Sequence, residues 1–348
     1  MNRNASNGAA NERKRQMATA ARDSAAWSRY WARGTLHSCP NAFPGNYGEE
    51  IRTLWLEYFS SLPSGARVLD IGTGNGAVAF LAQEAARANG RELLIEAIDA
   101  AEIDPRRAAA SHGLAIGDIV FRGKTSCERT GYARAQLDAV SSQYALEYTN
   151  VGETLIEMAR ILKPGGRALF VIHHADSVAL TTTRDELDAF AFLKHEAPIV
   201  IESQRWVQRV AAGRTPTEIE RLANDRESKS HARALERMLK RTVERARSHK
   251  HEAFLEAIAA QVAAAVREAS ATGPIAAFQR LNALTAEMAA HRDRLAAILR
   301  AAHTATQIDE LALELGRAGF ETEPATELKI RGDDLVGWVL RATRAANP

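Results

Sequence analysis

The sequence predicts an α/β fold built on a mostly parallel sheet, and three observations carry that prediction. Short runs rich in aliphatic and β-branched residues alternate with helical patterns from about residue 66, which is typical of strands joined by crossover helices. The first of these runs continues directly into a glycine-rich segment. A long stretch of helical pattern then interrupts the alternation, which returns near the end of the chain.

The beginning of the chain predicts a flexible end followed by a cap. Residues 1–25 are polar and lack the apolar core of a secretory signal, so we expect a disordered N-terminus. Residues 26–60 are rich in aromatic and turn residues, which favours a helical cap or lid over a site; a helix packed on the edge of the sheet is the alternative. The candidates for its substrate side are Tyr30, Trp31, His37 and Tyr47.

A core is expected over residues 61–175, with five strands. The strand candidates are the runs at 66–72, 92–99, 118–123, 137–146 and 166–174. Helical patterns separate them. The last of these patterns is closed by "KPGG", where Pro164 and Gly165 stop a helix and turn the chain.

Residues 176–303 predict an all-helical insertion. Apolar residues recur there at helical spacing, so at least two long amphipathic helices need a surface to pack on. That surface is either the rest of the insertion or a second subunit, which would make a homodimer. Residues 203–251 hold 13 Lys or Arg against 6 Asp or Glu. This excess is typical of a solvated helix face, with an anionic substrate or RNA as the alternative.

The α/β pattern returns over residues 304–348. A helix with a capping-box-like start at Thr306 and Asp309 is expected first. Two strand patterns follow, at 320–330 and 335–343, joined by the turn-like "RGDD". They predict an antiparallel hairpin at the edge of the sheet, which brings the sheet to seven strands.

Composition and charge limit the possible classes. The 348 residues are 46% apolar and 25% charged, as in an ordinary globular protein, and no stretch approaches the roughly 20 apolar residues that cross a membrane. The formal net charge of +2 gives no argument for a nucleic-acid partner. Cys39 and Cys127 have no CxxC spacing, so we expect no disulfide framework, no metal site and a reducing, cytoplasmic compartment.

The glycine-rich segment "VLDIGTGNG" leaves two classes of ligand open. Gly72, Gly74 and Ala77 fit the dinucleotide fingerprint, so a nicotinamide or flavin enzyme has to be considered. Asp70 favours another ligand, because a carboxylate beside the loop repels a pyrophosphate and suits a ligand with an ammonium and a sulfonium. Gly76 adds a third bare backbone position that the dinucleotide fingerprint does not require.

Asp99 ends the second strand candidate, 23 residues after Gly76. An acidic side chain at that place can accept hydrogen bonds from both hydroxyls of a ribose. This property fits either class of ligand. A surface carboxylate at a strand end is the alternative interpretation.

Five segments in this order resemble the class I S-adenosylmethionine-dependent methyltransferases. They are "VLDIGTGNG", "AID", "LDAVSSQYALEY", "ILKPGGRALFVIHH" and "LVGWVLRAT", and the resemblance covers residues 66–175 and 304–345. It implies a Rossmann-like fold, S-adenosyl-L-methionine as cofactor and S-adenosyl-L-homocysteine as product. The positions it implies for the cofactor are Asp70, Gly72, Thr73, Gly74, Gly76, Asp99, Thr125, Ser126 and Gln143.

The sequence departs from the family pattern after the third strand candidate, whereas the end of the fourth strand candidate matches it. The stretch that holds Thr125 and Ser126 lacks the family's usual acidic residue at the expected position. Gln143 and Tyr144 end the fourth strand candidate, where the family flanks the methyl group and the substrate.

Methyl transfer from a sulfonium is an in-line displacement, so the protein contributes chiefly position. A general base is needed only for a protonated nucleophile. His173 and His174 follow the fifth strand candidate, and either could be that base, with Asp176 orienting one ring. Alternation along the strand points the two rings to opposite sides. A strand-end histidine bonded to backbone is the alternative. The catalytic candidates are therefore His173, His174 and Tyr144.

We therefore expect a cytoplasmic methyltransferase that moves a methyl group to oxygen or nitrogen of a small molecule, with no membrane or nucleic-acid partner. A helical insertion after the fifth strand would overhang the carboxyl ends of the strands and form one wall of a closed pocket. Three alternatives stay open. They are an RNA or protein methyltransferase that uses the basic helices, a non-catalytic scaffold that binds S-adenosylmethionine, and a nicotinamide oxidoreductase.

Overall fold

The computed structural model describes residues 22–39, 45–248, 252–271 and 273–346. The chain forms two compact units, one made of the chain up to Leu180 together with the chain from Ala297 onward, the other of Thr181–Ala296. The disordered N-terminus expected over 1–25 lies mostly outside the described residues. Its last part, residues 22–25, is instead helical, because it begins a helix that runs to Trp31.

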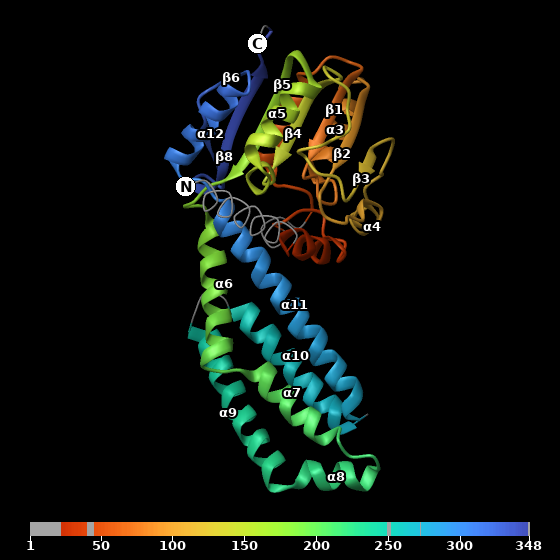
Figure 1. The fold of residues 1–348 in the computed structure, drawn as a ribbon, viewed down its shortest axis with the longest axis vertical. Coiled ribbons are helices and arrows are strands. Elements are labelled where there is room, and N and C mark those ends of the chain that lie inside the picture. Colours follow the sequence, from red (N-terminus) through yellow and green to blue (C-terminus); the bar gives the residue numbers. More distant parts are fainter. Residues whose placement is uncertain (1–21, 40–44, 249–251, 272, 347–348) are drawn as a thin grey trace, which may run out of the picture. The chain divides into compact units, whose positions relative to one another are not determined.

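The first unit contains one sheet of eight strands in the order β3-β2-β1-β4-β5-β8-β6, with β7 also paired to β8 (Figure 1). Strands β1 to β5 run parallel, and β8 is antiparallel to β5, β6 and β7. The predicted class, a mostly parallel sheet with a C-terminal antiparallel hairpin, is confirmed. The strands are β1 Ala66–Ile71, β2 Leu93–Ile98, β3 Val120–Arg122, β4 Leu137–Gln143, β5 Leu162–His173, β6 Phe320–Thr322, β7 Thr326–Ile330 and β8 Asp334–Arg344.

The last strand position differs in detail from the prediction. The single strand expected over 320–330 is divided into β6 and β7, so the sheet has eight strands rather than seven. Pro324 lies in the gap and has no N–H to donate to the ladder. The N–H of Glu323 still donates to the carbonyl of Arg341 at 3.1 Å, so both pieces follow the same edge of β8.

Helices cover both faces of the sheet, because strand residues alternate between two apolar cores. Val68 and Ala139 face a core that they share with α2 (Glu49–Ser60), α3 (Ala77–Ala88) and α4 (Pro105–Ser111). Their neighbours Leu69 and Val140 face a second core. That core contains the apolar side chains of α5 (Val151–Ile161) and α12 (Ala305–Arg317).

Helix α12 begins two residues before the expected start. Thr304 is its N-cap, and the side chain of Thr304 accepts from the N–H of Gln307 while the Gln307 side chain accepts from the N–H of Thr304. The capping box is therefore formed by Thr304 and Gln307, not by Thr306 and Asp309. The sequence pattern was ambiguous here because two threonines stand two residues apart.

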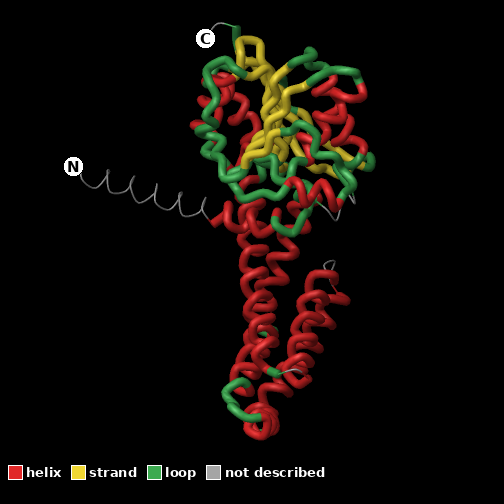
Figure 2. Tube along the Cα trace, turned by 90° about the vertical axis from the view of Figure 1, so that its right-hand side faces the viewer, coloured by secondary structure: helices red, strands yellow, loops and turns green. Residues whose placement is uncertain are grey.

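The second unit is helical and has its own core. Figure 2 shows the strands confined to the first unit. Trp206, Leu235, Leu255, Val262 and Leu281 are among the buried side chains that fill the helical core. The helices of this part of the chain are α6 Val178–His195, α7 Ile199–Val210, α8 Pro216–Asn224, α9 Arg226–Ser248, α10 Glu252–Ala271 and α11 Pro274–Ala301.

Several cations of the basic segment are paired with carboxylates. Arg209 contacts both Asp225 and Glu227, Arg241 contacts Glu196, and Arg245 contacts Asp188. Such pairs are typical of a solvated helix face. Among the described helices, none is both long enough and apolar enough for a membrane crossing.

Candidate active site

A cavity of about 330 Å³ lies at the carboxyl ends of β1 to β4, where ligands enter folds with this kind of parallel sheet. Its described lining comes from the first unit, both from the segments that follow the strands and from the N-terminal segment. The second unit contributes no described residue to this lining. The lining residues used below are Asp23, Trp27, Trp31, His37, Tyr47, Asp70, Gly72, Thr73, Asp99, Ser126, Cys127, Glu128, Gln143, Tyr144 and Tyr148.

The glycines after β1 shape the turn, and their role differs from the one expected. Gly72 and Gly74 have φ of +60° and +55°, a region that disfavours side chains. A Cβ on Gly72 would overlap the Cβ of Ala145, and a Cβ on Gly74 would lie 2.5 Å from the ring of Trp31. Of the three glycines, Gly72 lines the cavity, whereas Gly74 and Gly76 do not.

The N–H groups of this turn are also used within the protein. The N–H of Gly74 donates to Asp99 Oδ2 at 2.8 Å, and the N–H of Gly76 donates to the carbonyl of Thr73 at 2.9 Å. The N–H groups of Gly74 and Gly76, which were expected to face a ligand, are thus engaged within the protein. Their lack of a side chain allows close packing: Trp31 on Gly74, and Phe121 on Gly76.

Asp70 lies at the floor of the cavity with one oxygen uncommitted. Its Oδ1 accepts a hydrogen bond from the Ser141 hydroxyl at 2.7 Å, and its buried Oδ2 has no hydrogen-bond partner among the described residues. Burial raises the pKa of Asp70 to about 7, against the opposing effect of the Thr73 and Ser141 hydroxyls and with a further contribution from Asp99. A positively charged group of a ligand would satisfy the free oxygen.

Asp99 stands at the end of β2 and braces the glycine turn. Its two oxygens accept from the N–H groups of Gly74 and Ala101, at 2.8 and 2.7 Å. Burial raises the pKa of Asp99 to about 6, although both backbone hydrogen bonds act in the opposite direction. Each carboxylate oxygen can accept a further hydrogen bond, and Asp99 lines the cavity beside Asp70.

Another polar atom of the lining, Gln143 Nε2, is buried without a hydrogen-bond partner among the described residues. The other atom of the Gln143 amide, Oε1, accepts from the indole N–H of Trp55. Gln143 is 7% exposed, so water does not readily supply the missing contact. Trp55 was missed from the sequence, because 88 residues separate it from Gln143.

The loop after β3 forms another wall. Ser126, Cys127 and Glu128 line the cavity. Thr125 does not line it, and its hydroxyl donates to the carbonyl of Gly123 at 3.2 Å. Of the two cofactor residues predicted here, the structure therefore places Ser126 at the cavity. Glu128, which was missed, is the acidic residue of this wall, and it accepts from the N–H of Asn150 at 2.8 Å.

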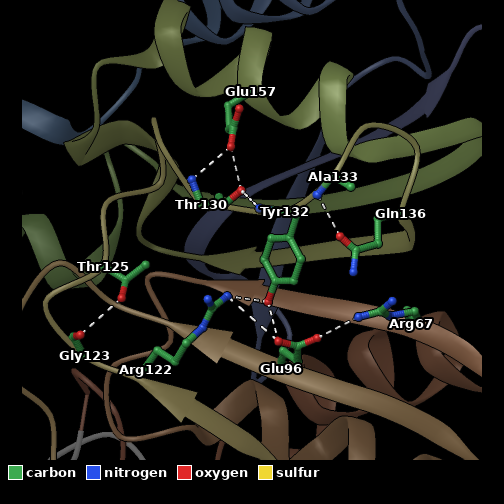
Figure 3. A network of polar contacts seen from close by, with 10 residues as sticks. All are labelled: Arg67, Glu96, Arg122, Gly123, Thr125, Thr130, Tyr132, Ala133, Gln136 and Glu157. Atoms are coloured by element: carbon green, nitrogen blue, oxygen red, sulfur yellow. Dashed lines mark hydrogen bonds and ion pairs between the residues drawn. The ribbon is translucent and has the colours of Figure 1, made fainter.

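A polar network holds this loop against the sheet (Figure 3). The Tyr132 hydroxyl donates to Glu96 at 2.7 Å and accepts from Arg122 at 2.6 Å. Glu157 accepts from both the N–H and the hydroxyl of Thr130, at 2.9 and 2.6 Å. Burial alone would raise the pKa of Glu157, but the hydrogen bonds from Arg160 and Thr130 lower it to about 2.

The N-terminal segment covers the cavity with aromatic side chains. Trp27 stacks on Trp31 with ring centroids 5.6 Å apart, and Trp27 also meets the edge of Tyr148 at 5.9 Å. Trp27 and Tyr148 line the cavity but were not among the predicted residues. Tyr30 was among the predicted residues but does not line the cavity. The hydroxyl of Tyr30 donates to the carbonyl of His37 at 2.9 Å.

His37 and Tyr47 do line the cavity, stacked with ring centroids 4.5 Å apart. The Nδ1 of His37 accepts from the N–H of Cys39 at 3.2 Å, which leaves Nε2 to donate to the carbonyl of Gly45 at 3.0 Å. Burial lowers the pKa of His37 to about 4, against the effect of the Gly45 hydrogen bond. His37 is thus a neutral wall of the cavity with both nitrogens engaged.

His173 and His174 are absent from the described lining of the cavity. The Nδ1 of His173 lies 2.8 Å from Glu147 Oε1, and its ring packs behind Tyr144 with centroids 4.2 Å apart. The ring of His174 points to the other side, onto Trp338 at 4.3 Å. Strand alternation separates the two rings, as expected.

Two details of the catalytic prediction change. Asp176 contacts His174 through its backbone N–H, which donates to Nδ1 at 3.0 Å, rather than through its carboxylate. Tyr144 does line the cavity, but its hydroxyl donates to the carbonyl of Val336 at 3.1 Å. Tyr144 therefore presents its ring more than its hydroxyl to the cavity.

The described lining is acidic. It contains four carboxyl groups, and no lysine or arginine appears among the lining residues that the structure describes. Asp23 is paired with Arg300 at 2.8 Å, but Asp70, Asp99 and Glu128 form no ion pair with a described lysine or arginine, and a ligand with a pyrophosphate would face them at short range. The four residues are Asp23, Asp70, Asp99 and Glu128.

A family model described as a methyltransferase domain matches residues 45–242, more than half of the chain. Similar solved structures include an S-adenosylmethionine-dependent methyltransferase from Mesorhizobium loti, with 23% identity over 36% of this chain and 54% of that chain and a TM-score of 0.29. The YcgJ protein from Bacillus subtilis has 18% identity over 55% of this chain and 82% of that chain, with a TM-score of 0.30.

A geranyl diphosphate C-methyltransferase from Streptomyces coelicolor A3(2) has 17% identity over 35% of this chain and 44% of that chain, with a TM-score of 0.29. The chain spans about half the length of the Mesorhizobium and Streptomyces proteins. At these TM-scores the solved structures add no argument about the site. No curated protein matches the chain in sequence.

Proposed function

The chain belongs to the methyltransferase-domain family, and on this premise we propose that it is a class I, S-adenosylmethionine-dependent enzyme that methylates oxygen or nitrogen of a small molecule without negative charge. The observation that carries the proposal is the acidic, aromatic lining of the cavity below the N-terminal segment. Such a lining favours neutral or cationic groups, through carboxylates and through the faces of aromatic rings.

The residues of the cavity fit the cofactor. S-adenosylmethionine carries an ammonium, a carboxylate, a ribose and an adenine. The uncommitted oxygen of Asp70 suits the ammonium, and the unpaired amide nitrogen of Gln143 suits the carboxylate. Asp99 would hold the ribose, and the wall of Ser126 and Glu128 would hold the adenine.

The same lining opposes the nicotinamide alternative. A dinucleotide brings a pyrophosphate, and the described lining offers it no lysine or arginine and three carboxyl groups besides Asp23, which is paired with Arg300. The N–H groups of Gly74 and Gly76, which a pyrophosphate would need, are already bonded to Asp99 and Thr73.

The contribution of the chain to catalysis is position and exclusion of water. When bound, the cofactor supplies a methyl group activated by its sulfonium. Tyr144 and Gln143 form the wall at the end of β4, and the rings of Trp27 and Trp31 exclude water. Orientation of this kind lowers a barrier by on the order of several kcal/mol.

Proton transfer has few candidates in this arrangement. Both nitrogens of His37 are engaged, and His173 and His174 lie outside the described lining. This favours an acceptor whose nucleophilic atom reacts at neutral pH without a base to remove a proton from it. His173 contacts the cavity wall only indirectly, since its ring packs directly behind Tyr144.

Methyl transfer to fractionated acceptors tests the proposal. Protein is incubated with S-adenosylmethionine labelled in the methyl group and with separate small-molecule, RNA and protein fractions of a cell extract. We expect label in the small-molecule fraction, and none with the Asp70→Asn variant. Label in RNA or protein would favour the basic helices as the substrate surface, and cofactor binding without transfer to any fraction would favour a scaffold.

A further inference from the structure

We propose that Trp55 is a positioning residue that fixes the orientation of the Gln143 side-chain amide. In this orientation the NH₂ group of Gln143 selects nucleoside ligands that carry the carboxylate of an amino-acid head. The inference rests on the proposed function and adds to it the residue pair that sets this selectivity. Its basis is the contact between Trp55, in α2, and Gln143, at the end of β4.

The orientation of the Gln143 amide follows from the chemistry of its neighbour. An indole nitrogen only donates, so the oxygen of the amide must face Trp55 Nε1. The NH₂ group then points the other way. Its nitrogen is buried without a hydrogen-bond partner among the described residues, and Gln143 lines the cavity. The structure thus holds an unpaired donor on a residue of the cavity wall.

Trp55 is itself held firmly. It is 0% exposed, and its ring stacks on Phe59 with centroids 5.7 Å apart. The neighbouring Tyr58 fastens α2 to the sheet, because its hydroxyl lies 2.9 Å from the carbonyl of Val140 and 3.0 Å from that of Arg167. Val140 belongs to β4, so this contact ties α2 to the strand that ends in Gln143.

The register of the sheet brings Gln143 and Asp70 to the same face. Asp70 on β1 is paired with Ser141 on β4. Gln143 is two residues beyond Ser141, so its side chain stands on the same face, one step nearer the carboxyl edge. A negative oxygen and an NH₂ donor therefore lie in neighbouring positions, each without a partner among the described residues.

The group that matches both atoms is an α-amino acid head, with an ammonium for Asp70 and a carboxylate for Gln143. A simple cation would leave the NH₂ group of Gln143 unpaired, and a simple anion would meet Asp70. A nucleoside without the amino-acid part leaves both atoms unsatisfied. Selectivity for the amino-acid part is therefore expected, and Trp55 is expected to support it through Gln143.

Calorimetry on the full-length protein tests this, with S-adenosylhomocysteine and with 5′-methylthioadenosine, which lacks the amino-acid part. We expect Trp55→Phe to weaken S-adenosylhomocysteine binding about tenfold and to leave 5′-methylthioadenosine binding within about twofold of the wild type. Gln143→Leu is expected to do the same, and the double variant to be no weaker than Gln143→Leu, because Trp55 acts through Gln143.

Trp338→Phe is the matched control. Trp338 is also buried and also donates its indole N–H, to the carbonyl of His303 at 2.9 Å, but it does not line the cavity. We expect it to leave the affinity for both ligands unchanged. If Trp55→Phe does not fold, Gln143→Leu alone still tests the selectivity.

The outcomes separate this inference from the proposed function. Equal weakening of both ligands by Trp55→Phe, or unchanged S-adenosylhomocysteine binding in Gln143→Leu, would overturn the inference while the wild type still binds the cofactor product. Failure of the wild type to bind either ligand would instead overturn the proposed function.

Discussion

Burial of the Asp70 carboxylate lowers the stability of the free protein, and we propose that the same carboxylate binds the ammonium of the ligand. Asp70 is 2% exposed, and burial raises its pKa from 3.8 to about 7. Above that pH a largely desolvated carboxylate stands in the cavity with one oxygen unpaired among the described residues. A cationic ligand group would relieve this cost, so stability and binding make opposite demands on this residue.

Burial of Asp70 makes the stability of the protein depend on pH. Because the folded-state pKa of Asp70 is raised, the folded protein keeps a proton that the unfolded chain releases, and stability falls as the pH rises from about 4 to about 7. Asp70→Asn is therefore expected to stabilise the free protein at pH 8 by on the order of 2 kcal/mol, or roughly 5 °C in Tm. Thermal unfolding at pH 8 and pH 5 checks this, and an equal gain at both values would contradict it.

The protonation state of Asp70 is also expected to control ligand affinity. A ligand ammonium prefers the ionised carboxylate, so the affinity for S-adenosylhomocysteine is expected to fall about tenfold between pH 8 and pH 6, as Asp70 takes up its proton. Calorimetry at the two pH values measures this. Asp70→Asn should bind weakly and with little change over the same range, and an unchanged affinity of the wild type would exclude Asp70 as the ligand's partner.

The residues of the site were predictable to different degrees. Asp70 and Asp99, which both line the cavity, could be selected from the sequence because the ends of strands are predictable from local patterns. The pairing of Trp55 with Gln143 spans 88 residues and depends on how α2 packs on the sheet, which no local pattern encodes. The engagement of both His37 nitrogens by neighbouring backbone was hidden for the same reason.

At the scale of elements, the glycine turn joins the sheet to the N-terminal helix. Trp31 packs on Gly74, and the side-chain amide of Asn75 donates to the carbonyls of Trp31 and Thr35, at 3.0 and 2.7 Å. Asn75 also accepts from the N–H of Asp104 at 2.9 Å. The turn therefore sets the position of the aromatic side chains over the cavity as well as that of the proposed cofactor residues.

Gly74→Ala tests this coupling, with Gly90→Ala as control. Both glycines have positive φ, +55° and +58°, but a Cβ at position 90 would meet open space. We expect Gly90→Ala to cost about 1 kcal/mol from backbone strain alone. Gly74→Ala must also displace Trp31, so it should cost roughly 2 kcal/mol more and weaken S-adenosylhomocysteine binding. Urea unfolding and calorimetry measure the two effects, and equal costs in both variants would argue against the coupling.

The elements of the sheet were predicted well because periodicity and turn residues are local signals. The five parallel strands lie within the predicted runs, except that β5 begins four residues earlier, at Leu162. The division of the edge strand at Pro324 was readable in principle, since proline cannot donate to a ladder. The start of α12 was not, because choosing between Thr304 and Thr306 needs the side-chain geometry.

At the scale of the whole molecule, the chain leaves and re-enters the first unit at adjacent points. His174 and His303 form a parallel bridge. The N–H of Ala175 donates to the carbonyl of His303 at 2.9 Å, and the N–H of His303 donates to the carbonyl of His173 at 2.8 Å. Each unit also has its own apolar core. An insertion joined in this way can be removed without opening the sheet.

Replacing residues 181–296 by a flexible linker of about eight residues is therefore expected to leave a folded unit that binds S-adenosylhomocysteine within about threefold of the full-length affinity. The reason is that the described lining of the cavity lies in the first unit. Circular dichroism and calorimetry check the outcome. A folded unit with no affinity would show that the helical unit takes part in cofactor binding.

We propose that the acidic cavity floored by Asp70 and Asp99 binds a sulfonium nucleoside with an amino-acid head. Calorimetric titration of the full-length protein at pH 8, with S-adenosylhomocysteine and separately with NADH, tests it most directly. We expect saturable one-to-one binding of S-adenosylhomocysteine with a Kd below about 100 μM and no binding of NADH. Binding of NADH, or no heat from S-adenosylhomocysteine at about 1 mM, would contradict it.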